Sequence, residues 1–131
     1  MKSILCIDDD PTSLSIQTII LKHNHFCDQT ITKTNGQEAI DYYIELSRQP
    51  NSSYPEIIFL DLNMPVLDGW GFLDKFKSDL YSEFPKTWVY ILSSSVDPSD
   101  RSRSESYPFV KDFISKPITK EILQKINQDM K

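Results

Sequence analysis

The sequence predicts an α/β fold in which five strands alternate with five helices in one domain. Short apolar stretches typical of strands alternate five times with longer stretches typical of helices. The chain has 131 residues, which is an ordinary length for a single domain, and it contains no repeat and no linker. Strands and helices that alternate at this spacing are typical of βαβ units, which build a parallel sheet.

The first predicted strand and helix lie within the first 24 residues. Residues 3–7 are an apolar run that ends in charge. Asp10 and Pro11 then predict a helix start, because aspartate caps helix N-termini and proline suits the first helical position. We expect this helix to end near Asn24. Its predicted buried stripe comprises Leu14, Ile16, Ile19 and Ile20.

The middle of the chain continues the alternation. Residues 27–32 form a weaker, mixed strand, and a helix is expected from 35 to 48 with an apolar face. A polar loop follows. Residues 56–60 are apolar throughout and form the clearest strand in the sequence, which ends at Asp61.

The second half of the chain holds the remaining elements. The sequence predicts a helix over 69–80, a strand over 88–92, a helix over 97–106, a strand over 110–115 and a helix over 119–130. The helix over 97–106 has almost no apolar stripe, and we therefore expect it to be a mobile element.

The composition of the strands predicts their order. The first, third and fourth strands are nearly all apolar, as expected where helices cover both faces, whereas the second and fifth are mixed, which suits sheet edges. The order 2-1-3-4-5 satisfies this pattern with right-handed crossovers. The predicted fold is a doubly wound, flavodoxin-like (βα)5 domain.

Charge and composition exclude several classes of function. The net charge of −5 argues against binding to nucleic acid or to an anionic membrane, because such binding depends on lysine and arginine. No run approaches the roughly 18 apolar residues of a membrane span. The N-terminus does not resemble a signal peptide, and Cys6 and Cys27 do not have the spacing of a metal or redox motif. We expect a cytoplasmic protein.

Polar side chains follow four of the five predicted strands. They are Asp8, Asp9 and Asp10 after the first strand, Asp61 after the third, Ser93 after the fourth and Lys116 after the fifth. In an open parallel sheet, ligands bind at the carboxyl ends of the strands where the strand order reverses. Several carboxylates this close together repel one another unless a cation neutralises them, and Mg²⁺ prefers oxygen ligands. A neighbouring lysine suits an anion, so the sequence predicts a site for Mg²⁺ and a phosphoryl group.

Four motifs at these strand ends resemble one family. They are residues 6–11 (CIDDDP), 59–65 (FLDLNMP) with 68–69 (DG), 91–94 (ILSS) and 116–117 (KP). In this order they resemble the receiver domain of two-component response regulators. The resemblance covers residues 1–131, and it implies a single-domain regulator similar to the stand-alone chemotaxis regulators.

The resemblance implies a role for each matching residue. Asp61 would accept a phosphoryl group from a sensor histidine kinase or a histidine phosphotransfer protein. Asp9, Asp61 and the backbone carbonyl of Asn63 would hold Mg²⁺, and Asp8 would assist through a metal-bound water. Lys116 and Ser93 would each contact a phosphoryl oxygen. The site residues that the resemblance implies are therefore Asp8, Asp9, Asp61, Asn63, Ser93 and Lys116. Pro117 would follow a cis peptide bond.

The resemblance also implies a switch. Phosphorylation would draw Ser93 toward Asp61, and Phe113 would turn inward to fill the space. The change would be transmitted to an output partner through the face formed by the fourth helix, the fifth strand and the fifth helix. Ser93 stands where the family often has threonine, and Phe113 stands where many members have tyrosine. Asn63 and Ser95 occupy positions that tune the lifetime of the phosphoryl group.

Two other functions compete with this one. The first is a Mg²⁺-dependent phosphatase that uses Asp61 as its nucleophile. Such enzymes need a second acid two residues further on, where this chain has Asn63, which cannot act as a general acid. The second is a receiver-like binding module that works without phosphorylation. The presence of Asp9, Asp61 and Lys116 counts against it, and we expect a signalling domain rather than an enzyme.

Overall fold

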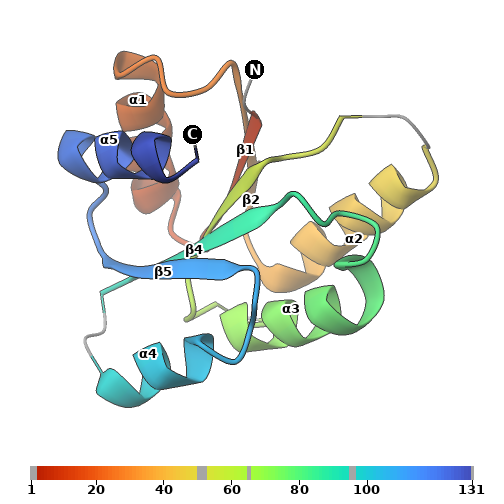
Figure 1. Cartoon of the computed structure of the whole chain (residues 1–131). Coiled ribbons are helices and arrows are strands. Elements are labelled where there is room, and N and C mark those ends of the chain that lie inside the picture. Colours follow the sequence, from red (N-terminus) through yellow and green to blue (C-terminus); the bar gives the residue numbers. More distant parts are fainter. Residues whose placement is uncertain (1–2, 50–52, 65, 95–96, 131) are drawn as a thin grey trace.

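The structure is a computed structural model that describes residues 3–49, 53–64, 66–94 and 97–130 (Figure 1). The described residues form five strands and five α-helices in strict alternation. The strands are β1 (Ser3–Ile7), β2 (Gln29–Lys33), β3 (Ile57–Leu60), β4 (Trp88–Ser93) and β5 (Val110–Ser115). The helices are α1 (Pro11–His23), α2 (Gly36–Ser47), α3 (Gly69–Lys75), α4 (Pro98–Ser104) and α5 (Lys120–Asp129).

The strands form one parallel sheet in the order β2-β1-β3-β4-β5. The predicted fold class and strand order are therefore confirmed. β1 and β3 are neighbours, and the register pairs Ile7 with Leu60. The residues that follow these two strands, Asp8 and Asp61, consequently emerge side by side. Their closeness is a direct result of the strand order.

Helices cover both faces of the sheet, with α1 and α5 on one face and α2 and α3 on the other (Figure 1). Alternate strand residues point to opposite faces, as the pleat requires. In β3, Ile57 and Phe59 pack with α1 and α5, whereas Ile58 and Leu60 pack with α2 and α3. All four are fully buried, which explains why this strand is apolar throughout.

The buried stripe predicted for α1 is wrong in two positions. Ile16 is 44% exposed and Ile19 is 65% exposed, whereas the buried residues of the helix are Leu14, Gln17 and Leu21. These three residues follow one another at helical spacing, so α1 is rotated relative to the prediction. The buried face carries a glutamine because the amide of Gln17 donates to Asp8.

Several element boundaries also differ from the prediction. β2 begins at Gln29 instead of residue 27, and the helix predicted over 69–80 has two parts. α3 ends at Lys75, and a π-helical turn over Phe76–Leu80 follows, in which the N–H of Tyr81 donates to the carbonyl of Phe76 at 2.8 Å. The wider turn buries both Phe76 and Leu80, which a simple helical periodicity could not predict.

A close backbone contact fixes the segment that follows Asp61. The N–H of Gly69 donates to the carbonyl of Leu62 at 3.0 Å. A Cβ atom on Gly69 would lie 2.7 Å from Leu62 Cα and 2.8 Å from the carbonyl oxygen of Asp61, so only glycine fits. The start of α3 therefore packs directly against the backbone at Asp61.

Candidate functional site

An acidic cluster lies at the carboxyl ends of β1 and β3. Asp8, Asp9 and Asp61 each offer one carboxylate oxygen, and these oxygens all lie within 4.8 Å of one another. Asp8 is fully buried and Asp61 is 8% exposed, whereas Asp9 is exposed. The structure thus brings together three of the residues that the sequence predicted to meet.

Lys116 reaches the same cluster from the end of β5. Its Nζ lies 2.7 Å from Asp8 Oδ2 and 3.8 Å from Asp61 Oδ2. Its backbone N–H donates to the carbonyl of Ser93 at 2.9 Å, which joins the ends of β4 and β5. The peptide bond between Lys116 and Pro117 is cis. The lysine therefore makes its shorter ion pair with Asp8 and not with Asp61.

Asp8 is held by residues that the sequence analysis missed. Ser13 Oγ donates to Asp8 Oδ2 at 2.6 Å, and Gln17 Nε2 donates to the same oxygen at 3.2 Å. Gln17 Nε2 also lies 3.1 Å from Ser13 Oγ, and the backbone N–H of Asp10 donates to Asp8 Oδ1 at 3.0 Å. Ser13 and Gln17 are four residues apart on α1, which places them on one face of the helix. That spacing, together with a glutamine among apolar positions, is the signal that could have identified them.

The two buried carboxyls have opposite pKa shifts. Burial alone would raise the pKa of Asp8, but hydrogen bonds from Lys116, Ser13 and the Asp10 amide outweigh it and hold the pKa below its ordinary value. Burial raises the pKa of Asp61 to about 6, and the charge of Asp8 adds to this shift, although Lys116 opposes it. Asp8 therefore carries its negative charge readily, whereas Asp61 carries its charge at an energetic cost.

The donor set fits a hard divalent cation. All three side chains offer carboxylate oxygens, which Mg²⁺ and similar ions prefer. Three carboxylates face one ammonium group, so Lys116 alone does not neutralise the cluster, and the charges of Asp8 and Asp9 both raise the pKa of Asp61. A bound cation would remove this repulsion. The residues present are thus suitable ligands for such an ion.

The structure also describes Ser93 and Asn63, two further predicted site residues. Ser93 is fully buried at the end of β4. The backbone N–H of Asn63 hydrogen-bonds to the carboxylate of Asp61, and the Asn63 side chain is exposed. Ser95 lies outside the described residues.

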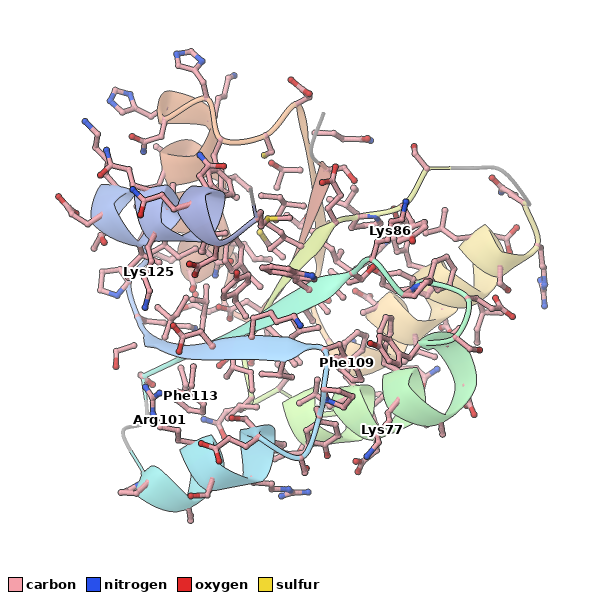
Figure 2. All side chains as sticks on the ribbon, viewed as in Figure 1. Lys77, Lys86, Arg101, Phe109, Phe113 and Lys125 are labelled. Atoms are coloured by element: carbon pink, nitrogen blue, oxygen red, sulfur yellow. The ribbon has the colours of Figure 1, made fainter. Side chains whose placement is uncertain are left out.

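Phe113 lies on β5 and Arg101 lies on α4, and Figure 2 shows these two labelled side chains next to each other. The ring is 6% exposed, so it already faces inward in this structure. Arg101 Nη2 donates to the carbonyl of Phe113 at 2.9 Å, and its guanidinium lies 5.6 Å from the ring centroid. Arg101 was not a predicted site residue.

Residues 4–128 match the family described as the response regulator receiver domain. The match covers nearly the whole chain, and it agrees with the strand order and with the acidic cluster at the carboxyl end of the sheet. The chain belongs to this family of two-component signalling domains. The resemblance stated from the motifs is confirmed.

Individual relatives support the same assignment. The chain is similar to a two-component response regulator from Cytophaga hutchinsonii, with 33% identity, a TM-score of 0.89, and coverage of 98% of this chain and 96% of the other. It is also similar to the Mn²⁺-bound form of the response regulator Rcp1, with 25% identity, a TM-score of 0.75, and coverage of 99% and 91%.

A curated relative is much longer than this chain. The two-component response regulator ARR12 of Arabidopsis thaliana is 29% identical over 126 residues, which is 95% of this chain and 19% of that protein. The chain therefore spans about a fifth of that relative's length. Within the described ranges, none of the helices combines the length and the apolar composition that a membrane span requires.

Proposed function

We propose that the protein accepts a phosphoryl group on Asp61 from a sensor histidine kinase or a histidine phosphotransfer protein, in a Mg²⁺-dependent reaction. Residues 1–131 would form one receiver domain that signals through protein contacts. The observation that carries the proposal is the convergence, in a member of this family, of three carboxylates within 4.8 Å with Lys116 Nζ 3.8 Å from Asp61 Oδ2.

The chain's own groups supply the chemistry. The carboxylate of Asp61 attacks phosphorus in line as the phosphorus–nitrogen bond of the donor phosphohistidine breaks, which leaves a neutral or protonated imidazole and an acyl phosphate. Lys116 donates to one phosphoryl oxygen and Ser93 donates its hydroxyl to another. Asp9, Asp61 and the carbonyl of Asn63 would hold Mg²⁺, with Asp8 assisting. The bound ion would supply positive charge to balance the phosphoryl oxygens.

The output would pass through the face formed by α4, β5 and α5. An acyl phosphate adds about −1.5 to −2 charge next to the end of β4, by analogy with other phosphorylated side chains. Ser93 would move toward that charge, and Phe113 would respond to the space it leaves. Ser104 is the one buried residue of α4, so the helix has little apolar packing to resist a shift. We infer a signalling role and no catalytic turnover beyond weak loss of the protein's own phosphoryl group.

The first experiment is incubation with acetyl phosphate and Mg²⁺, followed by intact-mass analysis. We expect a labile gain of one phosphoryl group in the wild type, and no gain with EDTA or in Asp61→Asn. Asp41→Asn is the matched control, because Asp41 is an exposed aspartate on α2, and this variant should be phosphorylated like the wild type.

Two other outcomes correspond to the competing functions. Release of phosphate over many turnovers would favour a phosphatase. A folded wild-type protein that gains no mass would favour a binding module that works without phosphorylation. Either result would contradict the proposal.

A further inference from the structure

One carboxylate oxygen at the site accepts from three side chains. Asp8 Oδ2 lies 2.7 Å from Lys116 Nζ, 2.6 Å from Ser13 Oγ and 3.2 Å from Gln17 Nε2. The other oxygen accepts from the backbone N–H of Asp10. Asp8 is fully buried, and its contacts with α1 and with Lys116 at the end of β5 fix the rotation of its carboxylate.

Gln17 makes these contacts at a cost to folding. Its side chain is on the buried face of α1, and the residue is 4% exposed. Its Oε1 is buried and has no hydrogen-bond partner in the described part of the chain. A buried polar atom without a partner destabilises the folded state. An apolar side chain of similar length would avoid that cost, so packing alone does not explain a glutamine here.

We propose that Ser13 and Gln17 are positioning residues for the phosphorylation site. They fix Asp8 so that its carboxylate holds Lys116 beside Asp61 without allowing the lysine to close on Asp61. This inference rests on the proposed function, because it concerns how Asp61 is kept available.

The two distances of Lys116 support this role. The ammonium is 2.7 Å from Asp8 and 3.8 Å from Asp61, so the fixed carboxylate is its nearer partner. If Asp8 lost the donors on α1, its carboxylate could rotate and Lys116 would turn to Asp61. The lysine would then compete with a metal ion for the Asp61 oxygens and would shield the nucleophile from phosphorus.

The test compares Gln17→Met and Ser13→Ala with the wild type in three measurements. They are Mg²⁺ affinity by calorimetry with the metal alone, the rate of phosphorylation by acetyl phosphate, and the thermal midpoint. We expect both variants to bind Mg²⁺ about 10-fold more weakly and to react about 10-fold more slowly, which is typical when a partner of a ligand is removed. Gln17→Met should change the thermal midpoint little, because losing the unpaired oxygen offsets losing the amide donor to Asp8.

Two further variants serve as controls. Gln37 on α2 is half-buried and donates to Asp41 at 3.0 Å in an exposed hydrogen bond, so Gln37→Met removes a similar glutamine–aspartate hydrogen bond away from the site. It should leave all three measurements unchanged. Ser13→Thr keeps the hydroxyl donor and should restore most of the Mg²⁺ affinity and phosphorylation rate lost in Ser13→Ala.

The outcomes separate this inference from the proposed function. If Gln17→Met lowers the thermal midpoint but binds Mg²⁺ and reacts like the wild type, the residue is purely structural and the inference is overturned. A wild type that binds no Mg²⁺ would also overturn it. If the wild type binds Mg²⁺ but gains no phosphoryl group, the proposed function fails, while a weaker Mg²⁺ affinity in the variants would still support the positioning role.

Discussion

Two corners of the domain are held in different ways. The first is where α1 meets Asp8, and the second is where α4 meets β5. At the first corner, α1 packs Leu14 and Leu21 against the sheet, and its polar residues Ser13 and Gln17 bind Asp8. At the second corner, α4 contributes Ser104 as its one buried residue, and Arg101 ties it to the backbone of β5. The first corner is thus fixed by a buried apolar and polar network, and the second by a partly exposed arginine.

This difference assigns different mechanical roles to the two sides. The α1 corner carries Asp8 and Asp9, and the proposed chemistry requires their carboxylates to stay close enough to Asp61 to share one cation. The α4 corner borders the face that we propose for output, and local opening of a protein is easiest where few apolar contacts hold an element. A rigid reaction site next to a weakly held helix suits a domain that converts a chemical change into a movement.

The largest expected effect is on the packing of α1. Leu21 is fully buried among the residues that pack α1 and α5 on the sheet. Leu21→Ala should lower the free energy of unfolding by about 3 kcal/mol, through lost burial and the cavity left behind. Urea denaturation followed by circular dichroism would measure this.

The matching change on α4 should have almost no effect. Ser102 is exposed, and Ser102→Ala should alter the free energy of unfolding by less than about 0.5 kcal/mol. If instead Ser102→Ala destabilised the protein as much as Leu21→Ala, the contrast between the two corners would be wrong.

Most of the fold could be predicted because its signals are local. The apolar run over 56–60 and the Asp-Pro helix starts at 10–11 and 97–98 are read from neighbouring residues, and the strand order follows from which strands are apolar on both faces. The π-helical turn at Phe76–Leu80 could not be predicted in this way. It depends on how two large side chains fit the existing core, which no periodicity encodes.

The acidic residues and the lysine of the site could be predicted from the sequence, but the residues that hold Asp8 in place could not. Asp8, Asp9, Asp61 and Lys116 end strands, so the topology alone brings them together. Ser13 and Gln17 act from a helix whose rotation was predicted wrongly, because Ile16 and Ile19 look like core residues in the sequence. The rotation follows from hydrogen bonds to Asp8, which are contacts between different elements of the fold.

The next largest effect on stability is expected at Asp61. This residue follows β3, which lies between β1 at the first corner and β5 at the second. Its pKa rises from 3.8 to about 6 on folding, so between these pH values the folded protein binds more protons than the unfolded chain. The contribution of Asp61 to the free energy of unfolding therefore falls as pH rises from about 4 to about 6. Without metal, Asp61→Asn should be more stable than the wild type by about 2 kcal/mol at pH 7, and the gain should vanish below about pH 4.

Mg²⁺ provides the control for this prediction. Added Mg²⁺ should stabilise the wild type more than Asp61→Asn, because a ligand stabilises the state that binds it. Thermal melts at pH 4 and pH 7, with and without Mg²⁺, would measure both effects. An equal gain for the variant at both pH values would mean that the charge of Asp61 is not the cause.

A smaller effect on stability than at Asp61 is expected at Arg101. β5 is an edge strand, and the carbonyl of Phe113 accepts from Arg101 instead of from another strand. The arginine side chain is 59% exposed and lies 3.8 Å from Asp112, so water weakens its charge interactions. Arg101→Met should lower the free energy of unfolding by about 1 kcal/mol. Its main effect should be faster hydrogen exchange in α4, with exchange in α1 unchanged.

Arg48→Met is the matched control, because Arg48 Nη1 lies 3.4 Å from Glu45 Oε2 and its side chain is 70% exposed. This variant should change neither the stability nor the exchange of α4. If α4 exchanged at the same rate in Arg101→Met as in the wild type, other contacts would hold the helix to β5. If exchange rose equally in α1 and α4, the two corners would open as one unit, and the separation between a fixed site and a weakly held output helix would not hold.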